Sequence, residues 1–177
     1  MSVDAGGWIR PESRIRTVRD ADLPAIRDIY NHYVRETTVT FDEEETVLAH
    51  WAHKRELLAS TGLPFLVAED EAGAVVGFAN AQHWREKSAY RYSAENSIYL
   101  APAAAGRGLG KALLEALLDE SAKAGLREII AVIEPTAAVA SIALHRRYGF
   151  TDAGMLRGVG VKFGRTLDVV FLQKSLT

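Results

Sequence analysis

The sequence predicts a mixed α/β fold, in which a central sheet carries helices on both faces. Segments with apolar residues at helical spacing alternate with short β-branched segments along the chain. Two strands, 64–70 and 74–82, flank a turn that contains Gly73 and form a clear hairpin. No internal repeat, low-complexity segment or linker divides the 177 residues. A chain of this length suits one globular domain with its own core.

The first third of the chain is predicted to contain one strand and two helices. Residues 14–18 form a short strand, and 20–34 form a helix with Pro24 in its first turn and an aspartate as its cap. The β-branched run 36–41 is predicted to be extended. Residues 44–60 form the second helix. Its inward side chains are expected to be Val47, Leu48, Trp51 and Leu58.

The rest of the chain is predicted to alternate strands and helices after a polar and aromatic loop at 83–92. The further elements are a strand at 94–100, a helix from near Gly108 to about Lys123, a strand at 127–134, a helix at 138–149, and two C-terminal strands around a glycine-rich turn. The run 127–134 is almost continuously apolar, which indicates a strand covered on both faces. The expected order is therefore β-α-α-β-β-β-α-β-α-β-β.

Composition excludes several classes of protein. Hydrophobic residues make up 48% and charged residues 25%, and the net charge of −2 favours neither nucleic acid nor an anionic membrane as a partner. The chain has no cysteine, which excludes disulfides, thiolate metal sites and a cysteine acyl-enzyme. No metal-ligand spacing emerges among the histidines. No apolar run approaches the ~18 residues that span a bilayer, and the start lacks a secretory signal. We expect a flexible tail over 1–13 and a cytoplasmic protein.

The loop "AGRGLGK", 105–111, joins a predicted strand to a predicted helix. It is not a P-loop, because Ala105 and Ala112 stand where that motif needs Gly and Ser or Thr. It also lacks the third glycine of a dinucleotide-binding fingerprint. The unpaired N–H groups and the dipole of a helix N-terminus nevertheless favour an anion. Glycine lets a phosphate approach closely, and Arg107 and Lys111 add positive charge. The alternative is a tight turn without a ligand.

Four segments together closely resemble the acetyl-CoA-binding half of the GNAT acetyltransferase superfamily: "SIYL", "AGRGLGKALL", "AVIE" and "ASIALHRRYGF". The segments "WREKSAYRYSAENSIYL" and "GVKFGRTLDVVFLQ" resemble its phosphinothricin and methionine sulfoximine N-acetyltransferase branch, and the resemblance runs over about 14–176. It implies a largely antiparallel sheet in which two neighbouring parallel strands, 94–100 and 127–134, splay apart. It also implies one N-acetyltransferase domain over 14–177 and a homodimer.

The resemblance implies acetyl-CoA as co-substrate and no metal. The main chain of the strand would pair with the pantetheine arm, and the glycine loop would hold the pyrophosphate. The implied cofactor-binding residues are Ile98, Tyr99, Leu100, Gly106, Arg107, Gly108, Leu109, Gly110, Lys111 and Ser141. Two positions depart from the family pattern: Ala105 replaces a usual Gln or Arg, and Ala138 replaces an Asn that contacts the coenzyme. Each missing side-chain hydrogen bond is typically worth about 1 kcal/mol.

Glu95 stands where the family places its general base. An α-amino group is largely protonated near neutral pH, and a carboxylate can accept its proton, directly or through water. The alternative is a satisfied glutamate on an edge strand. The expected substrate-binding residues are Trp84, Arg85, Ser88, Ala89, Tyr90 and His145. Arg85 and Arg91 are candidate clamps for an acceptor carboxylate, against the alternative of simple surface solvation. His145 has the alternative of a packed, hydrogen-bonded helix residue.

The expected function is direct acetyl transfer from acetyl-CoA to the α-amino group of a small amino acid or analogue. Phosphinothricin, methionine sulfoximine and methionine sulfone are the acceptors that the resemblance implies. One alternative is a degenerate relative with weak or no catalysis that acts as a binding module, since two coenzyme contacts are replaced by alanine. Another is an acetyltransferase for a different amine, such as a polyamine, an aminoglycoside or a protein amine.

Overall fold

The computed structural model describes residues 14–177, and the tail predicted over 1–13 lies outside the described residues. These residues form one seven-stranded sheet in the order β1-β2-β3-β4-β5-β7-β6. The elements are β1 (Arg14–Thr17), η1 (Asp20–Asp22), α1 (Leu23–Glu36), α2 (Leu48–Thr61), β2 (Phe65–Glu69), β3 (Val75–His83), η2 (Ser88–Tyr90), β4 (Ser93–Leu100), η3 (Pro102–Ala104), α3 (Leu109–Lys123), β5 (Glu128–Ile133), α4 (Val139–Arg147), β6 (Thr151–Lys162) and β7 (Arg165–Ser175).

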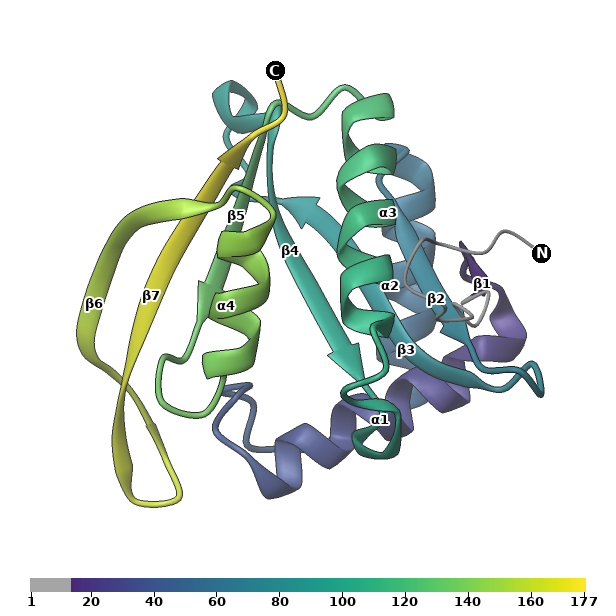
Figure 1. The fold of residues 1–177 in the computed structure, drawn as a ribbon, viewed down its shortest axis with the longest axis horizontal. Helices are drawn as coiled ribbons and strands as arrows, with labels where there is room; N and C mark the ends of the chain where they lie inside the picture. Colours follow the sequence, from purple (N-terminus) through teal and green to yellow (C-terminus); the bar gives the residue numbers. More distant parts are fainter. Residues whose placement is uncertain (1–13) are drawn as a thin grey trace, which may run out of the picture.

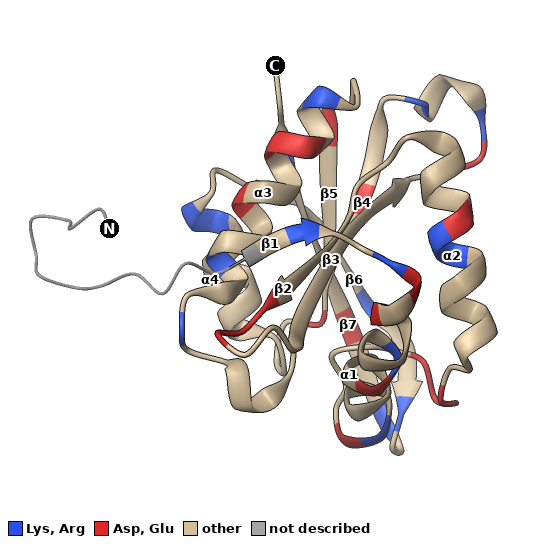
Figure 2. Ribbon diagram, turned by 90° about the vertical axis from the view of Figure 1, so that its right-hand side faces the viewer, with Lys and Arg blue, Asp and Glu red and all other residues tan. Residues whose placement is uncertain are grey.

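The described residues form three layers, with helices on both faces of the sheet (Figure 1). Helices α3 and α4 lie on one face, and α1 and α2 lie on the other (Figure 2). The predicted order of strands and helices and the predicted mixed α/β class are both confirmed. Apolar side chains fill the space between the layers, as amphipathic helices on a sheet require. Among the fully buried ones are Ile26, Trp51, Val67, Phe78, Leu113, Leu117 and Ile129.

Strands β4 and β5 run parallel, whereas every other neighbouring pair in the sheet is antiparallel. Their pairing covers three positions and ends where Glu95 lies opposite Ile130. Strand β4 stays paired with β3 up to Leu100, and β5 stays paired with β7 up to Ile133. The two inner edges therefore part after Glu95. This is the splay that the family resemblance implied.

Strand β5 is covered less completely than its apolar run predicts. Alternate side chains point to opposite faces of a strand. Ile129, Ala131 and Ile133 are buried, whereas Ile130 and Val132 are only half-buried. The second face opens onto a cavity beside the splay, to which Val132 contributes. The prediction of burial on both faces is therefore wrong for that face.

The extended segment predicted over 36–41 is also wrong. Helix α1 continues to Glu36, and an irregular loop over 37–47 follows it. The threonine hydroxyls satisfy nearby backbone groups instead of leaving the backbone to a sheet. Thr37 Oγ1 donates to the Tyr33 carbonyl at 2.8 Å, and Thr40 Oγ1 accepts a hydrogen bond from the amide of Asp42 at 3.2 Å. These local bonds override the β-propensity of the segment.

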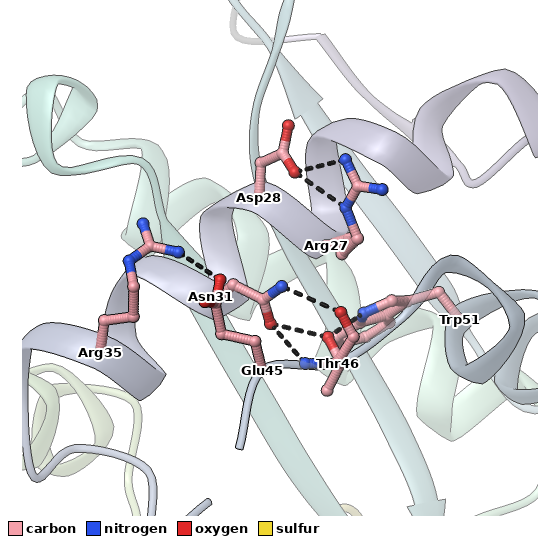
Figure 3. A network of polar contacts seen from close by, with 7 residues as sticks. All are labelled: Arg27, Asp28, Asn31, Arg35, Glu45, Thr46 and Trp51. Carbon is pink, nitrogen blue, oxygen red and sulfur yellow. Dashed lines mark hydrogen bonds and ion pairs between the residues drawn. The ribbon is translucent and has the colours of Figure 1, made fainter. Parts of the chain in front are cut away.

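A buried amide joins this loop to the two helices beside it (Figure 3). Asn31 on α1 accepts hydrogen bonds from the N–H and hydroxyl of Thr46 and donates to the Thr46 carbonyl. The indole of Trp51 donates to Thr46 Oγ1 at 2.8 Å. Helix α2 therefore begins only at Leu48. Val47 and Leu48 are 66% and 41% exposed, which corrects their predicted inward placement; Trp51 and Leu58 are buried as predicted.

Replacing Asn31 with alanine is expected to lower the free energy of unfolding by about 1–3 kcal/mol, because Asn31 is buried and half-buried Thr46 loses its hydrogen bonds to it. Urea unfolding followed by circular dichroism measures this. Asp28→Ala is the control, since Asp28 is exposed and, among the described residues, pairs only with Arg27 (Figure 3), and surface pairs contribute within about 0.5 kcal/mol. Equal losses in the two variants would contradict the assigned role of Asn31.

Candidate active site

A cavity of about 440 Å³ lies on the α1/α2 face of the sheet, beside the splay. Paired residues of antiparallel strands share a face, so Gln82 opposite Glu95 and Asn80 opposite Ser97 point to the same side. Helix α2 covers them with His50, Trp51 and Lys54, and the loop 37–47 closes the rim. The size lies within the range of small-molecule sites. The further lining residues are Tyr30, Val39, Thr40, Phe41, Asp42, Phe78, Tyr99, Val132, Glu134 and Val169.

Glu95 is half-buried in this cavity, at the last paired position of β4 and β5. Burial raises the pKa of its carboxyl, and the nearby charges of Lys54 and Arg85 oppose that rise. A carboxylate whose pKa is raised toward neutrality binds a proton more readily. The glutamate that the resemblance implies as general base thus lines this cavity.

Ordered polar contacts form the rim of the cavity. The hydroxyl of Tyr30 donates to the carboxylate of Asp42 and contacts Thr40 Oγ1 at 2.8 Å. Burial raises the pKa of Tyr30 and of Tyr99, so both phenols stay neutral. The Tyr33 hydroxyl donates to the Leu100 carbonyl at 2.6 Å. The wall between α1 and β4 is therefore fixed by side chains that carry no charge.

A smaller cleft of about 90 Å³ occupies the gap between β4 and β5. It shares Glu95, Ser97, Tyr99 and Val132 with the larger cavity, so the two hollows adjoin. Within residues 14–177, the inner edge of β4 has no strand partner beyond Glu95. Buried backbone N–H and C=O groups need hydrogen-bond partners, so an extended ligand can pair with this edge. The stretch includes Ile98, Tyr99 and Leu100, whose main chain is the predicted pantetheine contact.

The predicted anion loop has the backbone that close approach requires. Gly106 and Gly108 have φ values of +78° and +81°, which side chains rarely allow, and a Cβ added at either glycine would meet no neighbouring atom within 4 Å. Gly108 is the N-cap of α3, so the unpaired amides of its first turn follow directly. Arg107 and Lys111 are exposed beside it. Leu109 packs into the core, and Leu109 and Gly110 form the start of the first turn of α3, where backbone amides have no partner within the helix.

The two alanines that depart from the family pattern lie at the ends of this site. Ala105 is exposed, directly before the loop, and Ala138 is 8% exposed at the N-cap of α4. The Ala138 amide donates to the Glu134 carbonyl at 3.2 Å. Neither alanine fills or blocks the loop, and the cradle itself is intact. Its free amides, positive φ values and flanking cations fit a diphosphate group.

Glu134 is a buried carboxylate that sequence reasoning missed. Burial opposes its ionisation, but hydrogen bonds from Thr136, Ala137 and Thr38 outweigh burial and lower the pKa of Glu134. The side chain therefore stays charged and joins the turn before α4 to the loop 37–47. A glutamate followed two residues later by a threonine, directly after an apolar strand, is the sequence pattern that could have indicated this buried, hydrogen-bonded carboxylate.

His145 lies in the small cleft, away from the 440 Å³ cavity, and is 3% exposed. Its Nδ1 lies 2.7 Å from the Ser141 carbonyl, which can only accept, so Nδ1 carries the proton. Nε2 then accepts from the Asn96 amide at 2.9 Å. Burial lowers the pKa of His145, so the ring is neutral with both nitrogens engaged. This geometry favours the packed alternative over a substrate-binding role. Ser141 also lines the cleft.

The predicted acceptor loop lines a second, more open groove of about 1120 Å³ beside the end of α2. Trp84, Ser88 and Tyr90 contribute to it, and Ala89 lies exposed in the same η2 turn. The groove meets the cavity at Gln82, which lines both. The loop that the sequence singled out therefore lines one side of the hollow region. The sequence did not single out Lys54 and Asn80, which line the adjoining cavity, because those residues lie on elements distant in the sequence.

The two arginines of this loop are exposed and occupied with local contacts. Arg85 stacks on the ring of Trp84 at 4.1 Å and donates to the Trp84 carbonyl. Arg91 stacks on Tyr92 at 4.5 Å and donates to the Ser88 carbonyl. Arg85 lies near enough to influence Glu95, whereas Arg91 does not contribute to the cavity.

Within residues 14–177, no group of three or more His, Asp or Glu side chains is placed to hold a metal ion. In the same part of the chain, none of the helices has the length and apolar character needed to cross a bilayer.

Comparison with known proteins defines the class. The family model described as "Acetyltransferase (GNAT) family" matches residues 26–150. The chain is 42% identical to a phosphinothricin N-acetyltransferase of Alcaligenes faecalis, over 92% of this chain and 82% of that protein. It is 43% identical to an L-methionine sulfoximine/L-methionine sulfone acetyltransferase of Pseudomonas paraeruginosa, over 92% of this chain and 94% of that protein. The chain belongs to the GNAT acetyltransferase family.

A solved structure agrees with this assignment. A phosphinothricin acetyltransferase from Sinorhizobium meliloti, in complex with acetyl-CoA, superposes with a TM-score of 0.89 at 40% identity. The match covers 92% of this chain and 88% of that one. The fold that the resemblance implied, including the largely antiparallel sheet with two parallel strands, is confirmed.

Glu95→Gln is expected to stabilise the folded protein at neutral pH. Because burial raises the folded-state pKa of Glu95 above its unfolded value, the ionised form is disfavoured in the fold. The pKa of Glu95 is thus higher in the folded state than in the unfolded state. As pH rises from below the lower of these two values to above the higher one, the wild-type protein loses stability relative to the Glu95→Gln variant. Urea unfolding between pH 4 and 8 measures the difference. Glu71→Gln, in the exposed β2–β3 turn, is the control. A difference that shrinks as pH rises would contradict the prediction.

Proposed function

We propose that this protein transfers an acetyl group from acetyl-CoA directly to the α-amino group of a small amino acid or amino-acid analogue. The observation that carries the proposal is the position of Glu95, at the junction of the 440 Å³ cavity with the gap between β4 and β5. The names of the relatives support methionine sulfoximine, methionine sulfone and phosphinothricin as acceptors. We assign the activity to a single domain over 14–177.

Acetyl-CoA supplies the activated acetyl carbonyl when bound. The amides of 106–111, with Arg107 and Lys111, hold its diphosphate, and the inner edge of β4 at 98–100 pairs with its amide-bearing arm. Ser141 lines the gap that this arm enters. These contacts bring the acetyl group to the side of the sheet where Glu95 lies, which converts an encounter in solution into a reaction within one site.

Glu95 acts as the general base on the acceptor. The α-ammonium of an amino acid must lose a proton before its nitrogen can attack, and Glu95 accepts that proton, directly or through water. The raised pKa of Glu95 makes this transfer more favourable than it would be for an exposed glutamate. Because the chain has no cysteine, the transfer proceeds without a thiol intermediate. We assign Trp84, Arg85, Ser88, Ala89 and Tyr90 to the outer wall that receives the acceptor's side chain.

The active protein is a homodimer in this proposal, and its location is the cytoplasm. The outer strand β6 supports a dimer, because its side chains are exposed although many are apolar. Apolar patches on a surface often mark an interface. Exposed residues on β6 and the turn after it are Met155, Leu156, Val159, Val161 and Phe163. The hairpin of β6 and β7 extends along one side of the molecule, where a second copy can reach it (Figure 1).

The activity is tested with acetyl-CoA and three acceptors, which are methionine sulfone, methionine sulfoximine and phosphinothricin. Release of free coenzyme A thiol is measured with a chromogenic disulfide. We expect turnover with at least one acceptor and a fall of about 10²–10⁴-fold in kcat for Glu95→Gln, the usual range for a lost general base. Activity should decline at acidic pH as Glu95 becomes protonated.

Calorimetry with coenzyme A accompanies this assay and distinguishes catalysis from a degenerate binding role. Micromolar binding together with turnover supports the proposal. Absence of thiol release above the Glu95→Gln background, with all three acceptors, would contradict it.

The dimer is tested by light scattering after size exclusion. Val161→Asp is expected to halve the mass of the particle. In a two-fold interface both subunits would carry the new charge, so each would bury a charged residue. Val47→Asp is a matched control, since Val47 and Val161 are both 66% exposed. A wild-type monomer at tens of micromolar, or a dimer that survives Val161→Asp, would count against the β6 interface.

A further inference from the structure

Lys54 is a cation without a direct anionic partner inside the cavity. It is half-buried on α2 and makes neither an ion pair nor a hydrogen bond with any of the described residues. Its Nζ lies 5.7 Å from the centre of the Trp51 ring. Burial lowers the pKa of Lys54, and the fields of Glu95 and Asp42 oppose this. A partly desolvated ammonium in this position is stabilised by an anionic ligand.

Asn80 is an independent sign of a ligand in the same cavity. It is 0% exposed on β3, and neither its Oδ1 nor its Nδ2 has a hydrogen-bond partner among residues 14–177. Buried amides are nearly always hydrogen-bonded, because an unpaired group loses its hydration without replacement. Asn80 lines the cavity and lies opposite Ser97 on β4, one position diagonal from Glu95. Such diagonal neighbours are roughly 7–8 Å apart.

The charges around the cavity match a zwitterion. Glu95 is negative, and Lys54 on α2 is positive. The carboxylate of Glu134 also lines the cavity, but it already accepts hydrogen bonds from Thr38, Thr136 and Ala137. Asp42 lies exposed at the rim with its carboxylate already bonded to Tyr30. Burial, followed by the field of Lys54, lowers the pKa of His50, which therefore adds no competing cation. An α-amino acid carries its ammonium and its carboxylate on one carbon, so this cavity can bind both groups at the same time.

We propose that Lys54 and Asn80 bind the α-carboxylate of the acceptor while Glu95 faces its amino group. The Lys54 ammonium forms the ion pair, and Asn80 Nδ2 donates a second hydrogen bond to the same carboxylate. This assignment rests on the proposed function. It moves the carboxylate contact from Arg85, which is exposed and stacked on Trp84, to residues within the cavity that holds Glu95.

Rigid packing supports this role for Lys54. Trp51 precedes it by one helical turn and is 2% exposed, and its indole donates to Thr46, which is itself hydrogen-bonded to Asn31 (Figure 3). The helix that presents Lys54 is therefore fixed to α1 and the loop 37–47. Positioning a substrate through an ordered side chain costs less conformational entropy than positioning it through a mobile surface residue.

The experiment compares L-methionine sulfone with its carboxamide, which keeps the amine and removes the carboxylate charge. Wild type and Lys54→Met are assayed with both acceptors. We expect Lys54→Met to lose at least tenfold in kcat/KM with the acid and less than twofold with the amide, while the KM of acetyl-CoA is unchanged. Asn80→Leu should show the same preference with a smaller loss. Lys123→Met is the control, because Lys123 is exposed and pairs with Glu120.

The amide separates carboxylate binding from an indirect effect on Glu95. Lys54 also lowers the pKa of Glu95, so its removal can change proton transfer. That change would affect both acceptors equally, and an equal loss would overturn the proposal. An unchanged kcat/KM with the acid would overturn it as well.

Binding measurements keep this inference distinct from the proposed function. If wild type acetylates neither compound, the proposed function fails on these acceptors, and calorimetry still tests the subsite without turnover. We then expect wild type to bind L-methionine sulfone at least tenfold more tightly than Lys54→Met does. Equal affinities, or no binding by wild type, would overturn the assignment of Lys54.

Discussion

The end of the pairing between β4 and β5, at Glu95 and Ile130, is the constraint on which the site depends. Each strand is held along its outer edge by another neighbour, β3 for β4 and β7 for β5. The inner edges can therefore part without unfolding either strand. Backbone groups that would have bonded across the gap become available to a ligand. The same divergence opens a passage from the α3/α4 side of the sheet to the carboxylate of Glu95.

The loop 37–47 closes the cavity because three different elements hold it. Thr38 donates to Glu134 after β5, and the Thr40 carbonyl accepts from Lys162 at the end of β6. Thr46 bonds to Asn31 on α1. Glu134 and Lys162 are almost fully buried, and each charge is offset by hydrogen bonds to this loop. Polar contacts between distant segments thus set the shape of the hollow in which Glu95 and Lys54 lie.

Close packing fixes the remaining wall. Gly160 on β6 lies against the ring of Phe41, and an added Cβ there would clash with Phe41 Cε2. A side chain at this position would force the ring, and with it the rim of the cavity, to shift. The aromatic side chains of Tyr30, Trp51, Phe78 and Tyr99 pack edge-to-face or stacked beneath the cavity. Such contacts add to the burial of apolar area and keep the floor rigid.

The sequence by itself determined the order of the elements and the glycine loop before α3, because these depend on local periodicity and short motifs, and its resemblance to a known family singled out Glu95 as the candidate base. It failed at 36–41, where threonine hydroxyls bond to nearby backbone, and at Val47 and Leu48, where Asn31 delays the start of α2. Only the tertiary structure brought Lys54, Asn80 and Glu95 into one cavity. Those residues come from three separate elements, and their proximity arises from sheet register and helix packing, neither of which any local pattern encodes.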